Sequence, residues 1–343
     1  MKQKRIADYG IRVGKLPCGP LNKITDVAGV RVGHSTVRDN THNTGVTVIL
    51  PTEKNIVVHK LVAASYVHNG FGKTVGTVQI DELGTLETPI ALTNTLNVGL
   101  VADALLGCMI ERCRRENIRV VSINPVVGEC NDSMLNTITD RAVTADHVRE
   151  AIESAERDFP EGDVGAGTGT QCYGMKGGIG SASRIVELDG KPYTIGVLVQ
   201  SNYGATADLT IGGRAVGQEI LDRVSGEECD KGSIMVILAT DIPLTARQLK
   251  RVIKRCSVGI ARLGSYIGHG SGEIFLGFST ANEITAGGSD IMQISCIREK
   301  KMDLLFRAAG EATEEAILNS MVCADEVHAF NGKVLKSLKD YLP

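Results

Sequence analysis

Residues 229–241 of this chain read Cys229-Asp-Lys-Gly-Ser-Ile-Met-Val-Ile-Leu-Ala-Thr-Asp241. The run from Ser233 to Thr240 is short and rich in Val, Ile and Leu, which is typical of a strand buried on both faces. A Gly-Ser pair stands directly before it. The plainest interpretation of that pair is a buried strand entered through a glycine turn.

The same Gly232-Ser233 pair also permits a specific chemistry. Glycine tolerates a strained backbone, so the hydroxyl of the following serine can attack the preceding carbonyl. An N→O acyl shift and hydrolysis would leave Ser233 as a new N-terminus. Its α-amine, with an unperturbed pKa of about 7.7–8.0, can act as general base for its own hydroxyl. No histidine is needed in such a site.

Composition places the chain among ordinary globular proteins. Its residues are 43% apolar and 22% charged, which is usual for a globular protein. Its length of 343 residues is that of one large domain or two smaller ones. A net charge of −3 and an aromatic content of 4% do not indicate a basic, base-stacking surface for nucleic acid. The 39 glycines exceed the usual share of about 7%, which predicts tight turns and close backbone approaches.

Nine cysteines occur without a Cys-x-x-Cys pair, which favours reduced thiols over a disulfide framework or a zinc site. The histidines show no His-Glu-x-x-His spacing, and we expect neither a metal nor a cofactor. The basic N-terminus is not followed by an apolar run, so it is not a signal peptide. The longest apolar stretch, Val98–Ile110, is too short to span a bilayer. We therefore expect a cytoplasmic protein without a membrane partner.

Strands and helices are predicted along the whole chain. Besides Ser233–Thr240, strand-like runs lie at Gly45–Leu50, Arg119–Asn124, Thr194–Gln200 and Glu273–Ser279. Helical patterns span Val98–Arg115 with Asn97 as its cap, the region near Ala145–Arg157, a stretch beginning at Thr245, and about Asp303–Met321.

The helix beginning at Thr245 carries Gln248 three residues later, which forms a capping box. Its pattern places Leu249, Ile253, Cys256 and Ile260 on one face, and the last helix places Leu305, Ala309, Ala312 and Ala316 on its inner face. Strict βαβ alternation fails in the first 90 residues. A layered mixed α/β sandwich of sheets and helices therefore fits better than a doubly wound sheet.

Two glycine-rich stretches suggest chemistry but fit poorly. Gly165–Gly169 neither follows a predicted strand nor opens a helix, so it predicts a structural loop or a pocket wall rather than a nucleotide site. Gly268-His-Gly-Ser-Gly-Glu273 resembles a hydrolase elbow, but His269 and Glu273 occupy the positions that need glycine. On its own, this second stretch predicts a turn serine and a carboxylate that opens a strand.

Several segments, taken in order, resemble one peptidase family. The segment Gly232–Leu249 resembles the start of the small subunit in the L-aminopeptidase/D-amidase-esterases and β-peptidyl aminopeptidases. Further matching segments are Leu21–His34, Asn69–Lys73, Glu82–Thr95, Pro125–Asp132, Gly162–Gly169 and Gly270–Thr280. The resemblance covers nearly the whole chain, and the motifs are specific as a set.

This resemblance implies a fold and a maturation step. The fold is an α/β (α+β) class, four-layer αββα sandwich, similar in its layers to the Ntn hydrolases but with different connectivity. A single domain, residues 1–343, would cleave itself between Gly232 and Ser233 into a large subunit, 1–232, and a small subunit, 233–343. Oligomers of the processed heterodimer are implied as well.

The resemblance also assigns roles to residues. Ser233 is nucleophile and, through its α-amine, base. Ser271 and Glu273 lie beside that amine, where a carboxylate favours the ammonium form and a hydroxyl can relay a proton. Asn202 matches the asparagine of the oxyanion hole. We expect Glu129 to bind the substrate's ammonium group, because its motif lines the family's pocket.

The predicted activity is that of a self-processing serine aminopeptidase or amidase acting on short peptides, amides or esters through an acyl-enzyme. One alternative is an acyltransferase or another amidohydrolase on the same fold, similar to ornithine acetyltransferases or to pantetheine and oligoamide hydrolases. Those relatives commonly carry Thr where this chain has Ser233. A second alternative is a non-catalytic scaffold or small-molecule binder, in which the precursor would never cleave.

Overall fold

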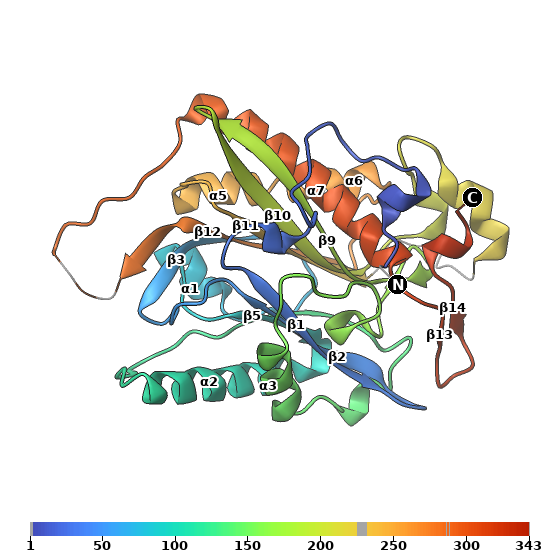
Figure 1. Ribbon diagram of the computed structural model, residues 1–343. Coiled ribbons are helices and arrows are strands. Elements are labelled where there is room, and N and C mark those ends of the chain that lie inside the picture. Colours follow the sequence, from blue (N-terminus) through green and yellow to red (C-terminus); the bar gives the residue numbers. More distant parts are fainter. Residues whose placement is uncertain (1–2, 225–231, 286, 288, 343) are drawn as a thin grey trace.

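The fold is described from a computed structural model covering residues 3–224, 232–285, 287 and 289–342. Two sheets stack face to face, and helices cover both outer faces (Figure 1). The chain therefore forms the four-layer αββα sandwich that was expected. Cys229 and the rest of residues 225–231 lie outside the described residues.

The larger sheet has six strands in the order β4-β3-β12-β11-β10-β9. Its strands are β3 (His59–Gly70), β4 (Thr85–Leu86), β9 (Gly178–Leu188), β10 (Lys191–Asn202), β11 (Gly232–Thr240) and β12 (Ser271–Thr285). The central strand β11 runs antiparallel to β10 and parallel to β12. The predicted strand at Ser233–Thr240 is thus the middle of the sheet.

The smaller sheet has four strands in the order β1-β2-β5-β6. These are β1 (Arg31–Arg38), β2 (Asn43–Leu50), β5 (Ile90–Asn94) and β6 (Val126–Cys130). Minor strand pairs are formed by β7 (Gln171–Cys172) with β8 (Met175–Lys176), and by β13 (Val327–His328) with β14 (Val334–Leu335).

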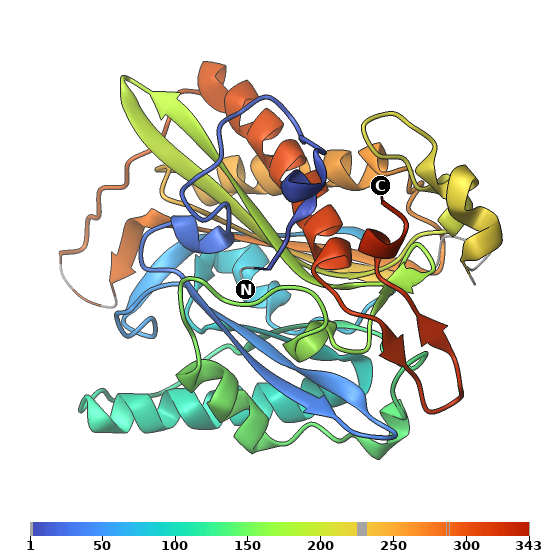
Figure 2. The same cartoon turned by 45° about the vertical axis from the view of Figure 1, so that its right-hand side comes forward.

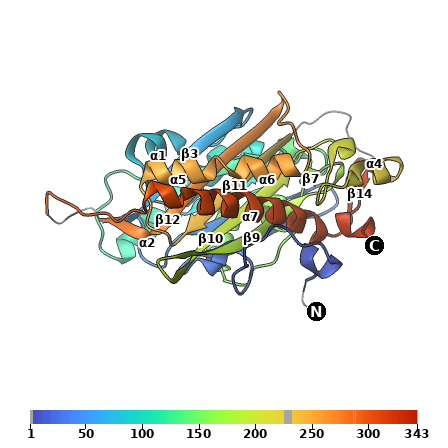
Figure 3. The same cartoon turned by 90° about the horizontal axis from the view of Figure 1, so that it is seen from above.

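Helices α5 (Ala246–Ile253), α6 (Cys256–Arg262) and α7 (Met302–Val322) lie over the six-stranded sheet, as Figure 3 shows from above. Helices α2 (Val98–Arg115) and α3 (Ala145–Glu153) cover the four-stranded sheet. The short helices α1 (Thr77–Leu83) and α4 (Val216–Ile220) lie in connections. Figure 2 shows the N-terminal segment running along the α7 side of the molecule.

Three apolar cores correspond to the three gaps between the four layers. One lies between the six-stranded sheet and its helices, one between the two sheets, and one under α2 and α3. The side chains of β11 point alternately into two of these cores. Ile234 and Val236 face the helices, whereas Met235 and Ile237 face the other sheet. A strand buried on both faces needs the continuous apolar run seen in the sequence.

Some sequence predictions were wrong in detail. Arg119–Asn124 is not a strand; Val121 is 86% exposed, and pairing with β5 begins only at Val126. Asn97 is the N-cap residue of α2 as predicted, but its side chain makes no cap bond. Asn94 caps the turn before it, where its side chain accepts from the backbone N–H groups of Leu96 and Asn97.

The helix predicted near Ala145–Arg157 ends at Glu153. The one beginning at Thr245 has the expected capping box but divides into α5 and α6, with its four predicted apolar residues all buried.

Candidate active site

A cavity of about 260 Å³ opens beside the start of β11. It is lined by residues from both sheets and their connecting loops: Phe71, Lys73, Thr95, Glu129, Asn131, Ser133, Met134, Gln171, Asn202, Gly232, Ser233 and Gly270. Three of the residues singled out in the sequence, Ser233, Asn202 and Glu129, therefore share one cavity. Such a concave site with a few converging polar groups is a typical substrate pocket.

Ser233 is the second residue of β11 and is 6% exposed. Gly232 before it has φ = +114°, a conformation that L side chains rarely adopt. A Cβ atom at Gly232 would lie 1.9 Å from the carbonyl oxygen of Asn202. Both observations require glycine at this position, at the peptide bond that was predicted to be cleaved.

Asn202 ends β10 and is the register partner of Ser233 across the antiparallel pair. Its side-chain oxygen accepts a hydrogen bond of 3.0 Å from the backbone N–H of Gln171. That bond fixes the orientation of the amide and leaves its NH2 group to donate. An amide donor held in this way beside a serine hydroxyl has the chemistry to stabilise an oxyanion.

Ser271 and Glu273 begin β12, the parallel neighbour of β11. The Ser271 hydroxyl donates to Oε1 of Glu273, and both side chains are fully buried. Their register partners are Gly232 and Ile234, one on each side of Ser233. Side chains alternate along a strand, so this pair lies on the helix-covered face of the sheet while the Ser233 side chain faces the other sheet. The pair and the hydroxyl thus flank the Ser233 backbone from opposite faces.

The turn before Ser271 is held by Asn69, at the end of β3. Its side-chain NH2 group donates to the carbonyl oxygens of Gly268 at 2.9 Å and Ser271 at 2.5 Å. The stretch at 268–273 is therefore a strand-opening turn, and its glycines are not arranged as a hydrolase elbow.

Glu129 lies in β6 of the smaller sheet and is 4% exposed. Its Oε1 accepts a 3.0 Å hydrogen bond from the backbone N–H of Lys73, and its Oε2 accepts from the Thr95 hydroxyl. Within the described part of the chain, Glu129 forms no ion pair. Neutral donors therefore hold a carboxylate at the cavity wall without cancelling its charge.

Sequence reasoning missed several residues of the site. Thr95 and Lys73 stand at the ends of two segments that carried the family resemblance, but nothing in their spacing indicated contact with Glu129. Cys130 also lies beneath the site, where its thiol donates to the carbonyl oxygens of Gln200 at 3.4 Å and Ser233 at 3.5 Å. Burial raises the pKa of Cys130 well above its usual value, so the group remains a thiol.

The glycine-rich stretch at Gly165–Gly169 is a buried structural turn behind the cavity. No cluster of three or more His, Cys, Asp or Glu side chains suited to a metal ion occurs among the residues that the structure describes. No helix in the described ranges has the length and apolar character needed to cross a bilayer.

Comparison with known proteins agrees with this geometry. The model of peptidase family S58 matches residues 22–335. The chain is 38% identical to the beta-peptidyl aminopeptidase BapA of Sphingosinicella microcystinivorans, over 97% of this chain and 89% of that protein.

Two solved structures resemble the fold closely. The PH0078 protein of Pyrococcus horikoshii OT3 has a TM-score of 0.94 and 46% identity, covering 99% of this chain and 98% of that one. The L-aminopeptidase D-Ala-esterase/amidase of Ochrobactrum anthropi, described as a prototype serine aminopeptidase with a variant of the Ntn hydrolase fold, has a TM-score of 0.93 and 35% identity over 98% of both chains. This chain is therefore a member of peptidase family S58, a hydrolase of the serine aminopeptidase/amidase type with an Ntn-hydrolase-like fold.

Proposed function

We propose that the chain is a precursor that cleaves itself between Gly232 and Ser233 and then releases N-terminal residues from short peptides, amino-acid amides or esters. The observation that carries the proposal is the meeting of Ser233, Asn202 and Glu129 in one cavity, with Asn202 directly opposite Ser233 in the sheet. The cavity then holds the proposed nucleophile Ser233, the proposed oxyanion donor Asn202 and, in Glu129, a group that can bind an ammonium.

Maturation begins when the Ser233 hydroxyl oxygen attacks the Gly232 carbonyl carbon. The C–N bond breaks as the C–O bond forms, which yields an ester and a free α-amine on Ser233. Water hydrolyses the ester, leaving a carboxylate on Gly232. The residue before the proposed scissile bond supports this assignment, because its backbone at φ = +114° is one that glycine adopts readily and other residues rarely do.

In the mature enzyme, the α-amine of Ser233 takes the hydroxyl proton as the oxygen attacks the substrate carbonyl. The NH2 group of Asn202 donates to the oxyanion that forms. Collapse returns the proton to the leaving amine and leaves an acyl-enzyme ester on Ser233. Water then attacks the ester, with the same amine as base, and the freed acid departs.

Two further groups complete the proposed roles. Ser271 and Glu273 orient the α-amine of Ser233 from the neighbouring strand, where their register partners flank it. Glu129 binds the ammonium group of the substrate, because its carboxylate faces the cavity and carries only neutral hydrogen-bond donors. Since the relative from Sphingosinicella microcystinivorans is named a beta-peptidyl aminopeptidase, N-terminal β-residues belong in the substrate panel beside α-residues.

The decisive experiment is the intact mass of the purified wild type beside Ser233→Ala. The proposed small subunit has 111 of the 343 residues, so the wild type should give pieces of about 12 and 25 kDa and the variant one of 36.5 kDa. Release of amine from aminoacyl and β-aminoacyl amides should accompany cleavage. A single uncleaved species that still hydrolyses these amides would refute the N-terminal nucleophile mechanism.

We also propose that processed heterodimers associate with further copies of themselves. Residues 289–298, which precede α7, extend away from the body of the protein (Figure 1) and expose 82% of Ile291, 52% of Met292 and 45% of Ile294. Such a run of exposed apolar side chains supports contact with another copy. Sedimentation velocity tests this: the wild type should sediment as an oligomer, and Ile291→Asp should reduce its size. A wild type that sediments as one processed heterodimer would refute it.

A cytoplasmic location is proposed on the chemistry of the cysteines. All those that the structure describes are free thiols, several of them fully buried. Thiols persist in a reducing compartment. Fractionation with thiol labelling of the native protein tests this, and recovery from an oxidising compartment would contradict it.

A further inference from the structure

Lys176 is a buried cation behind the candidate active site. It ends β8 and is 0% exposed. Its ammonium donates to three backbone carbonyl oxygens, those of Gly167 at 2.8 Å, Thr170 at 2.8 Å and Gly177 at 2.9 Å. Nowhere in the described ranges does a carboxylate form an ion pair with it. Its hydrogen-bond partners among the described residues are thus three peptide carbonyls, and Asp163 acts on it only from beyond ion-pair distance.

Such an arrangement is costly, because a buried charge without a counter-ion loses its hydration. Burial lowers the pKa of Lys176 to about 7. The more distant charge of Asp163 opposes this shift, and that of Arg38 adds to it. Three carbonyl partners favour the ammonium form, since only that form has three protons to donate. The ammonium thus serves three buried carbonyl oxygens and also places a positive charge behind the cavity.

One of the three carbonyls leads directly to the oxyanion donor. The C=O of Thr170 and the N–H of Gln171 belong to the same planar peptide group. Lys176 donates to the oxygen of that group, and the N–H of the group donates to Oδ1 of Asn202 at 3.0 Å. Hydrogen bonds in series polarise one another, so a cation on the carbonyl strengthens the bond made by the N–H.

We propose that Lys176 is a positioning residue for catalysis: through the Thr170–Gln171 peptide it fixes and polarises the side-chain amide of Asn202. The relay runs from the ammonium to the peptide C=O, from the peptide N–H to the Asn202 oxygen, and from the Asn202 NH2 group to the oxyanion. This inference rests on the proposed function, because it needs Asn202 as the oxyanion donor.

The test is a double-mutant cycle of Lys176→Met and Asn202→Ala, with kcat expressed per mole of cleaved enzyme. Lys176→Met should lower kcat roughly 10-fold, while KM changes less than about 2-fold. The fall in kcat is smaller than the roughly 10²–10³-fold loss from removing an oxyanion donor, because Asn202 itself is still present. In the Asn202→Ala background the same substitution should lower kcat no further, because the group through which Lys176 acts is gone.

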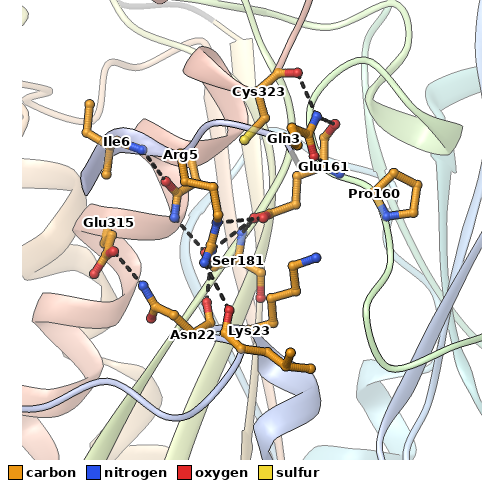
Figure 4. Close-up of polar contacts among 12 residues, drawn as sticks. Gln3, Arg5, Ile6, Asn22, Lys23, Pro160, Glu161, Ser181, Glu315 and Cys323 are labelled. Carbon is orange, nitrogen blue, oxygen red and sulfur yellow. Dashed lines mark hydrogen bonds and ion pairs between the residues drawn. The ribbon is translucent and has the colours of Figure 1, made fainter. Parts of the chain in front are cut away.

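Lys23 supplies the matched control. It is 7% exposed, and its ammonium donates to the backbone carbonyl of Phe159 at 2.5 Å and forms an ion pair with Asp158 at 2.7 Å. It lies beside the polar cluster of Figure 4 and does not line the cavity beside Ser233. Lys23→Met should lower the melting temperature without changing kcat. A fall in kcat for both lysine variants would mean that loss of stability alone explains the effect.

The outcomes separate the two proposals. If Asn202→Ala keeps full kcat, the oxyanion assignment itself fails. If Asn202→Ala is slow but Lys176→Met lowers kcat equally in both backgrounds, or not at all, the inference about Lys176 is overturned. Should Lys176→Met not fold, Lys176→Gln keeps two of the three donors, and an unchanged kcat in that folded variant would overturn the inference equally.

Discussion

Two buried glutamates, Glu161 and Glu129, differ in the groups that surround their carboxylates. Glu161 lies in a polar cluster near the N-terminus, where Arg5 forms an ion pair with it at 2.8 Å and the N–H of Ser181 donates to it at 2.6 Å (Figure 4). Glu129 lies at the cavity wall, where a backbone N–H and a threonine hydroxyl hold it. The first carboxylate is paired with a cation, whereas the second has only neutral hydrogen-bond donors among its partners in the described part of the chain.

The comparison assigns stability to one region and chemistry to the other. The N-terminal cluster ties the start of the chain to the six-stranded sheet and α7, since Arg5 also donates to the carbonyl of Asn22, and Asn22 donates to Glu315. Breaking this cluster should lower the free energy of unfolding and leave kcat of the folded enzyme unchanged. Altering the cavity should do the reverse.

The largest expected effect is on stability, from Glu161→Gln. The substitution leaves Arg5 in a mostly buried place without its carboxylate partner, which typically costs about 3–5 kcal/mol in free energy of unfolding. Chemical denaturation of the unmatured Ser233→Ala precursor measures it reversibly. The exposed pair Arg31–Glu53 is the control, where Glu53→Gln should cost less than about 1 kcal/mol. Equal costs would remove the distinction between these pairs.

Asn202→Ala should have the largest effect on catalysis. Loss of the oxyanion donor lowers kcat roughly 10²–10³-fold, or about 2.7–4 kcal/mol of transition-state stabilisation. Steady-state kinetics on an aminoacyl amide measures this. Asn282 is a comparably buried asparagine outside the cavity, bonded to Ser295, and Asn282→Ala should leave kcat unchanged. A kcat for Asn202→Ala near that of the wild type would contradict the assigned role.

Glu129→Gln should act on binding. The substitution keeps the shape of the side chain and removes its charge, so a substrate ammonium loses a charged hydrogen bond of about 1.5–3 kcal/mol. KM for an aminoacyl amide should rise roughly 10- to 100-fold, while maturation is unaffected. The matching hydroxyacyl amide, which has no ammonium, is the control. If its KM rises equally, Glu129 shapes the cavity and does not recognise the charge.

The smallest expected effect is a pH dependence of stability from His34, whose ring bonds to Thr47 at 2.9 Å and to the carbonyl of Pro160, next to Glu161, at 3.1 Å. Burial lowers the pKa of His34 from 6.5 to about 4. The unfolded chain therefore binds more protons between these values, and stability falls as the pH drops below 6.5.

Between pH 7 and 5.5 the loss from His34 is about 1.2 kcal/mol. Comparing the slope of unfolding free energy against pH in the wild type and in His34→Gln isolates this group, because glutamine does not titrate. The variant should show the shallower slope. Parallel slopes would show that the pKa of His34 is the same in the folded and unfolded states.

Strong local patterns predicted much of the fold. Helix α2 begins and ends at the predicted residues, and the strands at Gly45–Leu50 and Ser233–Thr240 differ from the observed ones by two residues or fewer. Arg119–Asn124 shows the limit of such patterns. Its apolar residues suit a strand, but a strand forms only where a partner is in reach, and β5 pairs with residues from Val126 onward.

The site divides in the same way. The sequence by itself determined the Gly232-Ser233 pair, the strand that follows it and the segments containing Asn202, Glu129, Ser271 and Glu273, because each belongs to a contiguous motif. Only the tertiary structure decided that β10 puts Asn202 opposite Ser233, and that Thr95 and Lys73 hold Glu129. The position of Lys176 behind Asn202 was decided there too. These contacts join residues far apart in the chain, and their geometry depends on strand register and burial, which no local pattern encodes.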